Sequence, residues 1–278
     1  VSEMAVKTSR VTATLTDGRT ALWAVAGLFL FALQAGAALN FLVGLTIDGL
    51  LAIPGVGSAG FLTTLETAVQ EIPTLLSRET IPNEGHYNGT GYEGTFMGLA
   101  PAMAWALRAT LIYVYAFVAV GWGIWGYRIY RQEYRAADWT PRDDVLDRFR
   151  GHKWGIFGLV IVFMFVTMAV FAPALGPTTV DQNMRNSYGH SIDYYDSETG
   201  SVETIKVGRA NGNSLSTGYS QNIGPWTYDD YGRFHPFGTL PDGSDLFTFI
   251  VVGSRISLVI GVLSVALSGS IAASLALT

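Results

Sequence analysis

Hydrophobic residues are concentrated in four long runs, and polar residues fill the segments between them. About 20 consecutive, mostly apolar residues are enough for a helix to cross roughly 30 Å of hydrocarbon. The runs therefore predict four transmembrane helices, at residues 20–52, 99–127, 154–175 and 254–278. The first run is longer than the core of a signal peptide, which has about 7 to 15 apolar residues, so we expect it to stay in the membrane as a helix.

Basic residues between the runs predict the side on which each polar segment lies, because Lys and Arg are retained in the cytoplasm. Segment 128–153 holds seven Lys and Arg residues, whereas segment 53–98 holds only Arg78 and segment 176–253 holds four. This pattern predicts a multi-pass protein of the cell membrane. Its N-terminal tail, residues 1–19, and the basic linker lie in the cytoplasm, and the other two segments lie outside.

The longer outer segment, residues 176–253, alternates short β-prone runs such as VETIKV with turn residues. This pattern is typical of hairpins, and polar segments of this length are usually functional or disordered. We therefore expect a mixed, partly β extracytoplasmic insertion in an otherwise all-α integral membrane protein. In the shorter outer segment, Asn88-Gly89-Thr90 fits the acceptor pattern for N-glycosylation.

Composition excludes several classes of protein. Hydrophobic residues make up 49% of the chain and charged residues only 14%, whereas a soluble domain has about 25% charged residues. The net charge of −5 argues against a nucleic-acid-binding protein, because such proteins are usually strongly basic. The chain has no cysteine, which excludes disulfides, a thiol nucleophile and cysteine-based metal sites.

Catalytic motifs are missing from the sequence. It contains no H-E-x-x-H zinc helix, no G-x-S-x-G elbow and no G-x-x-x-x-G-K-[ST] phosphate loop. The histidines lie far apart along the chain, at His86, His152, His190 and His235. We expect no catalytic, cofactor or metal site and no enzymatic activity. Without a phosphate loop, any ATP-driven transport must take its energy from a separate subunit.

One charged residue lies well inside a predicted span, and intramembrane charge is a functional hypothesis by default. Arg108 lies about nine residues into the second span, roughly 13 Å deep at the helical rise of about 1.5 Å per residue. Its side chain is expected either to extend toward the headgroups or to form an ion pair between helices, with a place on a substrate path as the alternative.

The fourth run differs from the others in its small residues, which recur at intervals of three and four. Such residues let helices approach closely inside a membrane bundle. The run therefore predicts a helix surrounded by protein, in which the small residues serve either tight packing or the lining of a polar pathway. The candidates for these roles are Ser264, Ser268 and Ser270.

The stretch HPFGTLPDGSDLFTFIVVGSRISL, residues 235–258, leads into this run. It resembles the segment that opens the core of permease subunits in the dipeptide, oligopeptide and nickel family of ABC importers, with a motif close to HPFGTDxxGRDxxSRxxxGxRxSL. The upstream run DRFRGHKWGIFGLVIVFMFVTMAVFAPALGP is similar to the first helix of that family. Leu240, Ser244 and Thr248-Phe249 depart from the motif, so no role is carried over to them. The residues that match the motif and are candidates for an outer gate are His235, Pro236, Phe237, Gly238, Thr239, Gly243, Asp245, Gly253, Arg255 and Ser257, and Leu258 also matches.

The resemblance implies a permease subunit of a type I ABC importer for peptides or related small solutes. It also implies partners: a second permease subunit, two ATPase subunits that hold ATP and Mg, an extracytoplasmic solute-binding protein and the lipid bilayer. Family permeases continue with more helices after the first core helix, whereas this sequence stops at Thr278. We therefore expect a C-terminally truncated core, preceded by two additional N-terminal helices.

The opening of the motif also predicts a local structure. A turn built from Pro and Gly residues is expected to set the angle at which the outer segment enters the bundle. The next residues, DLFTFIVVG, are expected to form a short amphipathic helix at the membrane surface, with Asp245 as its cap. Arg255 is expected to anchor the following span at the level of the headgroups.

A second class of function stays open from the sequence alone. A membrane-anchored sensor or scaffold would use the outer segment to bind a ligand and the basic linker to signal to a partner. Neighbouring genes distinguish the two classes, because an ATPase and a solute-binding lipoprotein favour transport, whereas a kinase or response regulator favours sensing.

Overall fold

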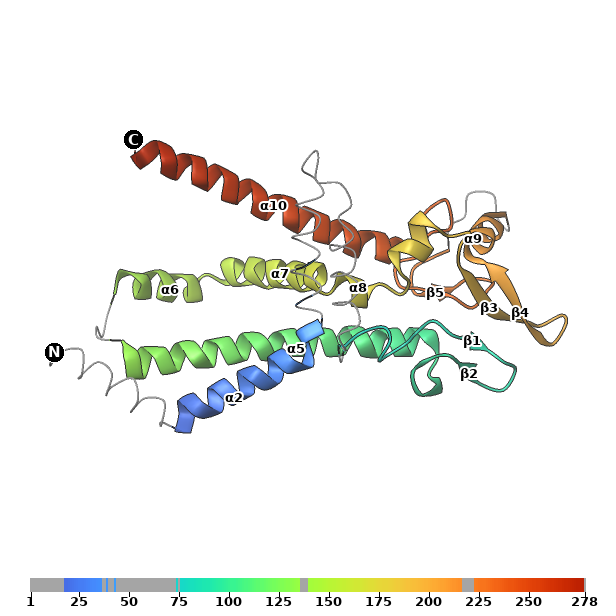
Figure 1. Cartoon of the computed structure of the whole chain (residues 1–278), viewed down its shortest axis with the longest axis horizontal. Coiled ribbons are helices and arrows are strands. Elements are labelled where there is room, and N and C mark those ends of the chain that lie inside the picture. The colour runs from blue at the N-terminus through green and yellow to red at the C-terminus, as the bar shows by residue number, and fades with distance from the viewer. Residues whose placement is uncertain are drawn as a thin grey trace.

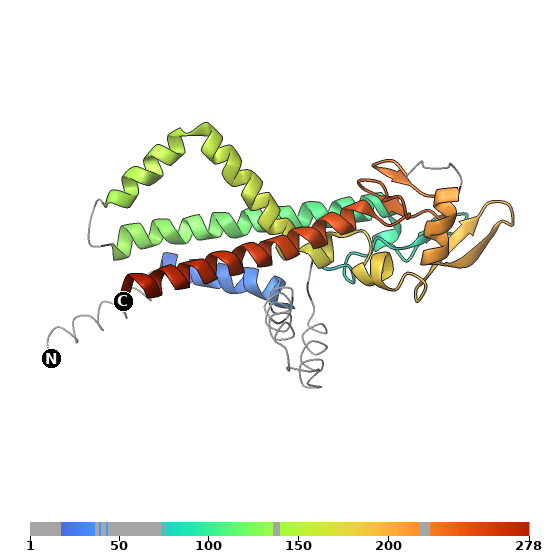
Figure 2. The ribbon, with the colours of Figure 1, turned by 90° about the horizontal axis from the view of Figure 1, so that it is seen from above.

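The molecule is elongated, with its long helices along one axis and its strands gathered at one end (Figure 1, Figure 2). The computed structural model describes residues 18–36, 39, 43, 74, 76–135, 140–216 and 223–277. The strand-bearing end lies opposite to the C-terminal end of the last helix, α10 (Figure 1).

Three helices in the described part of the chain are long and apolar enough to cross a membrane. They are α5 (Pro101–Ile129) with its π-helical extension η2 (Tyr130–Tyr134), α7 (Lys153–Val170), and α10 (Leu246–Leu277). Helix α2 (Gly18–Leu33) is apolar but shorter, and much of the predicted first span, including Asp48, lies outside the described residues. These helices are consistent with an integral membrane protein.

Two predicted helix boundaries differ from the structure. Helix α10 begins at Leu246, so the short surface helix expected before the span is instead the start of one continuous helix. The reason is packing, because Val251 is completely buried in the core that α10 shares with α5 and α8. Helix α7 ends at Val170, and a separate turn, α8 (Ala172–Leu175), carries Pro173 in its first turn.

The basic linker, predicted to lie in the cytoplasm, contains helix α6 (Pro141–Gly151), which meets α7 at an angle (Figure 2). Its N-cap is Thr140, and Asp143 completes a capping box by accepting from the backbone N–H of Thr140 at 2.8 Å. Arg135 pairs with the same carboxylate through both terminal nitrogens. The end of η2 is thereby tied to the start of α6.

In the part of the chain that the structure describes, six short strands form three antiparallel hairpins at the end opposite to α6. They are β1 (His86–Tyr87) with β2 (Tyr92–Glu93), β3 (Ser191–Asp196) with β4 (Ser201–Lys206), and β5 (Thr227–Tyr228) with β6 (Phe234–His235). The β3–β4 register runs from Ser191 opposite Lys206 to Asp196 opposite Ser201. The remaining elements are η1 (Phe96–Gly98), η3 (Asp181–Arg185) and α9 (Val207–Ser216).

The two predicted outer segments fold against each other. Strand β1 contacts strand β3, and the ring of Tyr87 meets that of Tyr195 edge to face with centroids 5.7 Å apart. At the base of this domain, the Trp105 ring packs against Trp226, Phe234 and Phe247 with centroids 5.3 to 5.8 Å apart. Aromatic contacts of this geometry add to the burial of apolar area. They join α5 and α10 to the strands.

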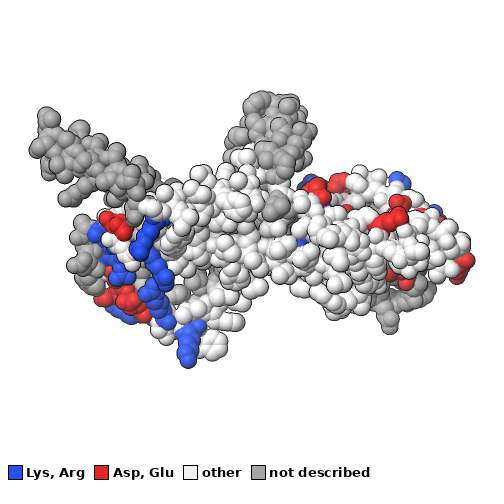
Figure 3. Space-filling model, turned by 90° about the horizontal axis from the view of Figure 1, so that it is seen from below, with Lys and Arg blue, Asp and Glu red and all other residues white. Residues whose placement is uncertain are grey.

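Charge is divided along the length of the molecule (Figure 3). Lys and Arg side chains, with several Asp and Glu side chains among them, gather at the end that holds α6. An almost uncharged band covers the middle, and Asp and Glu side chains, with fewer Lys and Arg, are spread over the strand-bearing end. A helix bundle in a bilayer needs such an uncharged band. The basic residues in the linker segment that the structure describes are Arg128, Arg131, Arg135, Arg148, Arg150 and Lys153, with Arg142 in the same segment of sequence.

A reciprocal pair of tryptophans joins α2 to α5. The rings of Trp23 and Trp122 stack with centroids 4.7 Å apart and planes 3° apart. Each indole N–H donates to the backbone carbonyl of the other residue, at 3.1 Å from Trp23 and 2.9 Å from Trp122. A glycine lies beside each ring and leaves space for it. A Cβ added to Gly27 would lie 2.4 Å from the Trp122 ring, and a Cβ added to Gly126 would lie 2.5 Å from the Trp23 ring.

Replacing Gly126 with Ala is expected to displace Trp23 and to lower the free energy of unfolding by about 1–3 kcal/mol, as overpacking does. Gly121 lies in the same helix, and a Cβ added there would have nothing within 4 Å, so Gly121→Ala is the matched control. It is expected to be neutral or stabilising by up to about 1 kcal/mol. Unfolding of both variants in mixed micelles measures the difference, and equal free energies would contradict this packing.

Candidate functional site

Residues 235–245, here called the motif turn, connect strand β6 to helix α10. The backbone N–H of Gly243 donates to the Leu240 carbonyl at 2.9 Å, and the N–H of Leu240 donates to the Ser244 carbonyl at 2.8 Å. Thr239 and Asp245 form an isolated antiparallel bridge around this loop. A tight turn is therefore present where the Pro and Gly residues predict one, and it leads directly into α10.

Two glycines are required by the geometry of the motif turn. Gly238 has a φ of +84° and Gly243 a φ of +78°, in the left-handed region that favours glycine. A Cβ on Gly238 would lie 2.3 Å from the Ile223 carbonyl oxygen, and one on Gly243 would lie 2.5 Å from the Asn211 carbonyl oxygen. Both positions therefore combine a backbone requirement with a close approach of another segment.

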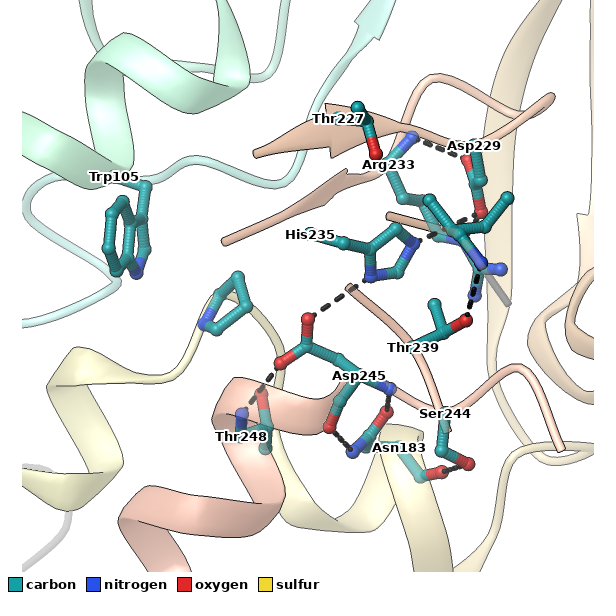
Figure 4. A network of polar contacts seen from close by, with 12 residues as sticks. Trp105, Asn183, Thr227, Asp229, Arg233, His235, Thr239, Ser244, Asp245 and Thr248 are labelled. Atoms are coloured by element: carbon teal, nitrogen blue, oxygen red, sulfur yellow. Dashed lines mark hydrogen bonds and ion pairs between the residues drawn. The ribbon is translucent and has the colours of Figure 1, made fainter. Parts of the chain in front are cut away.

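His235 lies between two buried carboxylates (Figure 4). Its Nδ1 is 3.1 Å from Asp245 Oδ2, and its Nε2 is 3.4 Å from Asp229 Oδ2. The side chain of His235 is 4% exposed, and those of Asp245 and Asp229 are 2% and 0% exposed. Arg233 Nε pairs with Asp229 Oδ2 at 2.6 Å. Buried charges must be paired, so these four side chains form one mutually compensating set.

This arrangement favours the charged form of His235. Burial by itself lowers the pKa of the imidazole, but hydrogen bonds and charges from Asp229 and Asp245 outweigh burial and raise the pKa above its ordinary value of 6.5. Burial raises the pKa of Asp229, but its hydrogen bond with His235 and the charge of Arg233 outweigh burial and lower the pKa. The two carboxylates therefore stabilise the imidazolium form of His235 relative to its neutral form.

Asp245 connects this network to the start of α10 (Figure 4). Its Oδ1 accepts from the backbone N–H of Thr248 at 2.6 Å, which is the N-cap contact expected for this residue. Asn183, on η3, holds the backbone of Asp245 from both sides, since it accepts from the N–H at 2.7 Å and donates to the carbonyl at 3.1 Å. Ser244 Oγ also donates to the Asn183 carbonyl, at 3.1 Å.

The remaining motif residues lie near the turn but outside the buried network. Phe237 is 51% exposed, and its ring packs edge to face on Phe247 with centroids 4.9 Å apart. The Pro236 carbonyl accepts from the backbone N–H of Trp226 at 3.1 Å. Further along α10, a Cβ added to Gly253 would have nothing within 4 Å, Arg255 is half-buried and Ser257 is exposed. Of the ten candidates, the structure brings together His235, Gly238, Thr239, Gly243 and Asp245.

The serine candidates on α10 lie further along the helix and are exposed. Their hydroxyls donate to carbonyls of their own helix four residues earlier, as in Ser264 to Ile260 at 2.7 Å and Ser270 to Ala266 at 2.7 Å; Ser268 bonds Ser264 in the same way. These polar groups are thus satisfied within α10 and compatible with an apolar environment. Both roles considered for them, packing and pathway, stay predictions.

Arg108 is held inside the protein by hydrogen bonds to backbone carbonyls, and its place on a substrate path stays a prediction. Its side chain is fully buried, so extension toward the headgroups is wrong. The guanidinium donates to four acceptors at 2.5 to 3.1 Å, and these are the backbone carbonyls of Ala174, Gly176 and Ile81 and the side-chain Oδ1 of Asn83. Arg108 therefore links α5 to the C-terminal end of α8 and to the segment before β1. It lies outside the motif turn.

Sequence reasoning missed several residues of the site. Asp229 and Arg233 lie in the stretch DDYGR, whose Asp and Gly residues predict only a turn. No local sequence pattern marks Asn183 as part of the site, because its partner Asp245 lies 62 residues further along the chain. In the described part of the chain, no group of three or more His, Asp or Glu residues is placed to hold a metal ion.

Comparison with known proteins gives one match. Residues 140–190 match a family model described as the N-terminal TM domain of oligopeptide transport permease C. No curated protein and no solved structure matches the chain. The matched region contains α6, α7, α8 and η3 and ends before the motif turn. The match supports an ABC importer permease family for this chain.

Proposed function

We propose that this chain is a membrane-spanning permease subunit of an ATP-driven importer. It forms part of the pathway for peptides or related small solutes that an extracytoplasmic binding protein delivers. Its partners are that binding protein, a second permease subunit and two ATPase subunits, which hold ATP and Mg. One observation carries the proposal. Asn183 lies inside the region matched by the permease model, and its side-chain amide makes two hydrogen bonds to the backbone of Asp245 in the motif turn.

The motif turn has a mechanical role in this proposal. Its buried ion pairs and its two glycines, which allow close approach of neighbouring segments, hold the outer domain rigidly to the first turn of α10. Alternating access requires packed units to move against each other while each stays intact. A rigid outer connection lets the outer domain and α10 move as one unit, and no chemistry at His235 is required.

Most of α10 is left for partners to cover. From Ile260 onward its large side chains are exposed, including Ile260, Val265 and Ile271 at 59%, 74% and 60%. Lipid, a second permease subunit and further helices of the core would all suit this surface. The small residues of α10 would permit close helix packing there.

The orientation can be tested with single cysteines, because the chain has none of its own. Ser197, between β3 and β4, and Asp147, on α6, are both exposed. We expect Ser197→Cys to react with a membrane-impermeant maleimide in intact cells and Asp147→Cys to react only after permeabilisation. The unmodified chain is the control for background labelling. Labelling in the opposite order would contradict a cytoplasmic N-terminus.

Transport itself can be tested in the native host by deleting the gene in a strain that requires an amino acid. We expect the strain to lose growth on short peptides that contain this amino acid while it keeps growth on the free amino acid. Complementation with the intact gene should restore growth. Unchanged growth on every peptide supplied, in a strain with no second peptide importer, would contradict the proposal.

A further inference from the structure

A cavity of about 400 Å³ lies inside the strand-bearing domain, next to the motif turn. Most of its walls come from three separate parts of the chain, within residues 83–86, 177–193 and 231–235, and Gly94, Pro101, Val207 and Asp245 also line it. Ligand pockets have volumes of about 300–1,000 Å³, so this cavity has the size for a small solute. The two predicted outer segments must fold together to form it.

Side chains of both charge signs line this cavity. Glu84 and Asp193 supply carboxylates, and Arg233 and His235 supply cationic groups. The acids are held in place, since Arg78 Nη2 lies 2.8 Å from Glu84 Oε1 and Thr204 Oγ1 donates to Asp193 Oδ1 at 2.6 Å. Each carboxylate has about four acceptor positions, so these contacts leave capacity for a ligand donor.

Arg233 has donor capacity that its neighbours do not use. Its Nε bonds Asp229 at 2.6 Å and its Nη1 bonds Asn211 at 2.6 Å. Its Nη2 is buried and has no hydrogen-bond partner among the residues that the structure describes. A buried donor without an acceptor is costly, and guanidinium groups bind carboxylates especially well.

We propose that the cavity binds a small zwitterion, an amino acid or a short peptide with free termini. Arg233 receives the carboxylate, and Glu84 and Asp193 receive the ammonium group. The mixed charge of the lining favours such a ligand over a simple anion or cation. The proposal deepens the transport function on which it rests, because it places a solute site in the outer domain, against the N-cap of α10.

The test is equilibrium dialysis of the full-length protein in lipid nanodiscs with radiolabelled L-alanyl-L-alanine, and with L-alanine in parallel to distinguish the two ligand sizes. We expect saturable binding of at least one of them. Blocking either charged group of that ligand, by N-acetylation or by amidation of the carboxyl, should weaken binding about 10-fold or more, since hydrogen bonds to charged groups are lost. Binding of the doubly blocked compound with equal affinity would overturn the assignment.

Variants locate the binding in this cavity. Asp193→Asn should weaken it about 10-fold, whereas Glu198→Gln, an exposed acid in the β3–β4 turn, should leave it unchanged. Arg233→Gln should weaken carboxylate binding, with Arg209→Gln as its exposed control. Arg233 also bonds Asp229 and Asn211, so its replacement could weaken binding by disturbing the fold. Ser191→Trp avoids this problem, because Ser191 is an exposed strand residue that lines the cavity, and the larger side chain would fill it. Unchanged binding in Ser191→Trp and Asp193→Asn would overturn the proposal.

The outcomes separate this inference from the transport function. Peptide-dependent growth that needs the gene, together with no binding of either solute to folded wild-type protein at millimolar concentration, would overturn the cavity site alone. Saturable binding that Ser191→Trp abolishes, in a protein without importer partners, would support the cavity site and contradict transport.

Discussion

Replacing Asp245 with Ala is expected to lower the free energy of unfolding by about 3–5 kcal/mol, the cost of breaking a buried charge pair by removing one partner. The variant leaves the imidazolium of His235 without one of its two carboxylates and removes the N-cap of α10. Chemical unfolding in mixed micelles measures the change. Asp230→Ala is the matched control, because Asp230 is exposed beside the same network, and its effect is expected to stay below about 0.5 kcal/mol.

The same network predicts how stability depends on pH. The pKa of His235 is raised on folding above 6.5, so its contribution is fully present below about pH 6.5 and is lost as the pH rises through the folded-state pKa. Unfolding of the wild type should therefore become easier as the pH rises above about 6.5, and His235→Gln should lack this part of the pH dependence. Parallel pH profiles for the two proteins, or an Asp245→Ala protein as stable as the control, would contradict the ion-paired network.

Replacing Arg108 with Ala is expected to cost a similar amount, about 3–5 kcal/mol, because four buried acceptors lose their donor at once. Arg108→Lys keeps the charge but not the planar fork, so we expect an intermediate loss of stability. Both variants are compared with the wild type by the free energy of unfolding in mixed micelles.

Arg128 provides the control for these substitutions, since it lies in the last turn of the same helix α5 and is exposed. Arg128→Ala is expected to change the free energy of unfolding by less than about 0.5 kcal/mol. If Arg108→Ala unfolds like the wild type but impairs uptake of peptides, Arg108 acts on the solute path and the structural role assigned to it is wrong.

The sequence predicts the long helices well, because a run of 20 apolar residues has few alternatives to a membrane helix. The hairpin at VETIKV and the turn at the Pro and Gly residues of the motif also follow from local chemistry. The start of α10 does not follow from local chemistry, because hydropathy indicates which residues lie in the bilayer and does not indicate where the helix begins. Asp245 and the packing of Val251 set that boundary.

The candidate site could be predicted only in part. His235 and Asp245 were found because both lie in one recognisable stretch of sequence. Asp229, Arg233 and Asn183 were missed because their importance comes from contacts across the fold, such as the 62-residue separation between Asn183 and Asp245. For Arg108 the predicted extension toward the headgroups was wrong, since the sequence does not show that the carbonyls at the end of α8 face α5.

Affinity purification of the full-length product from its native membrane, followed by mass spectrometry, tests the importer assignment most directly. The account predicts that an ATPase, a second permease subunit and a solute-binding protein purify with it, and that a variant with Asp245 replaced by Ala recovers less of this assembly. Recovery of the intact, folded wild-type protein with no ATPase, under conditions that preserve a known importer from the same membrane, would contradict it.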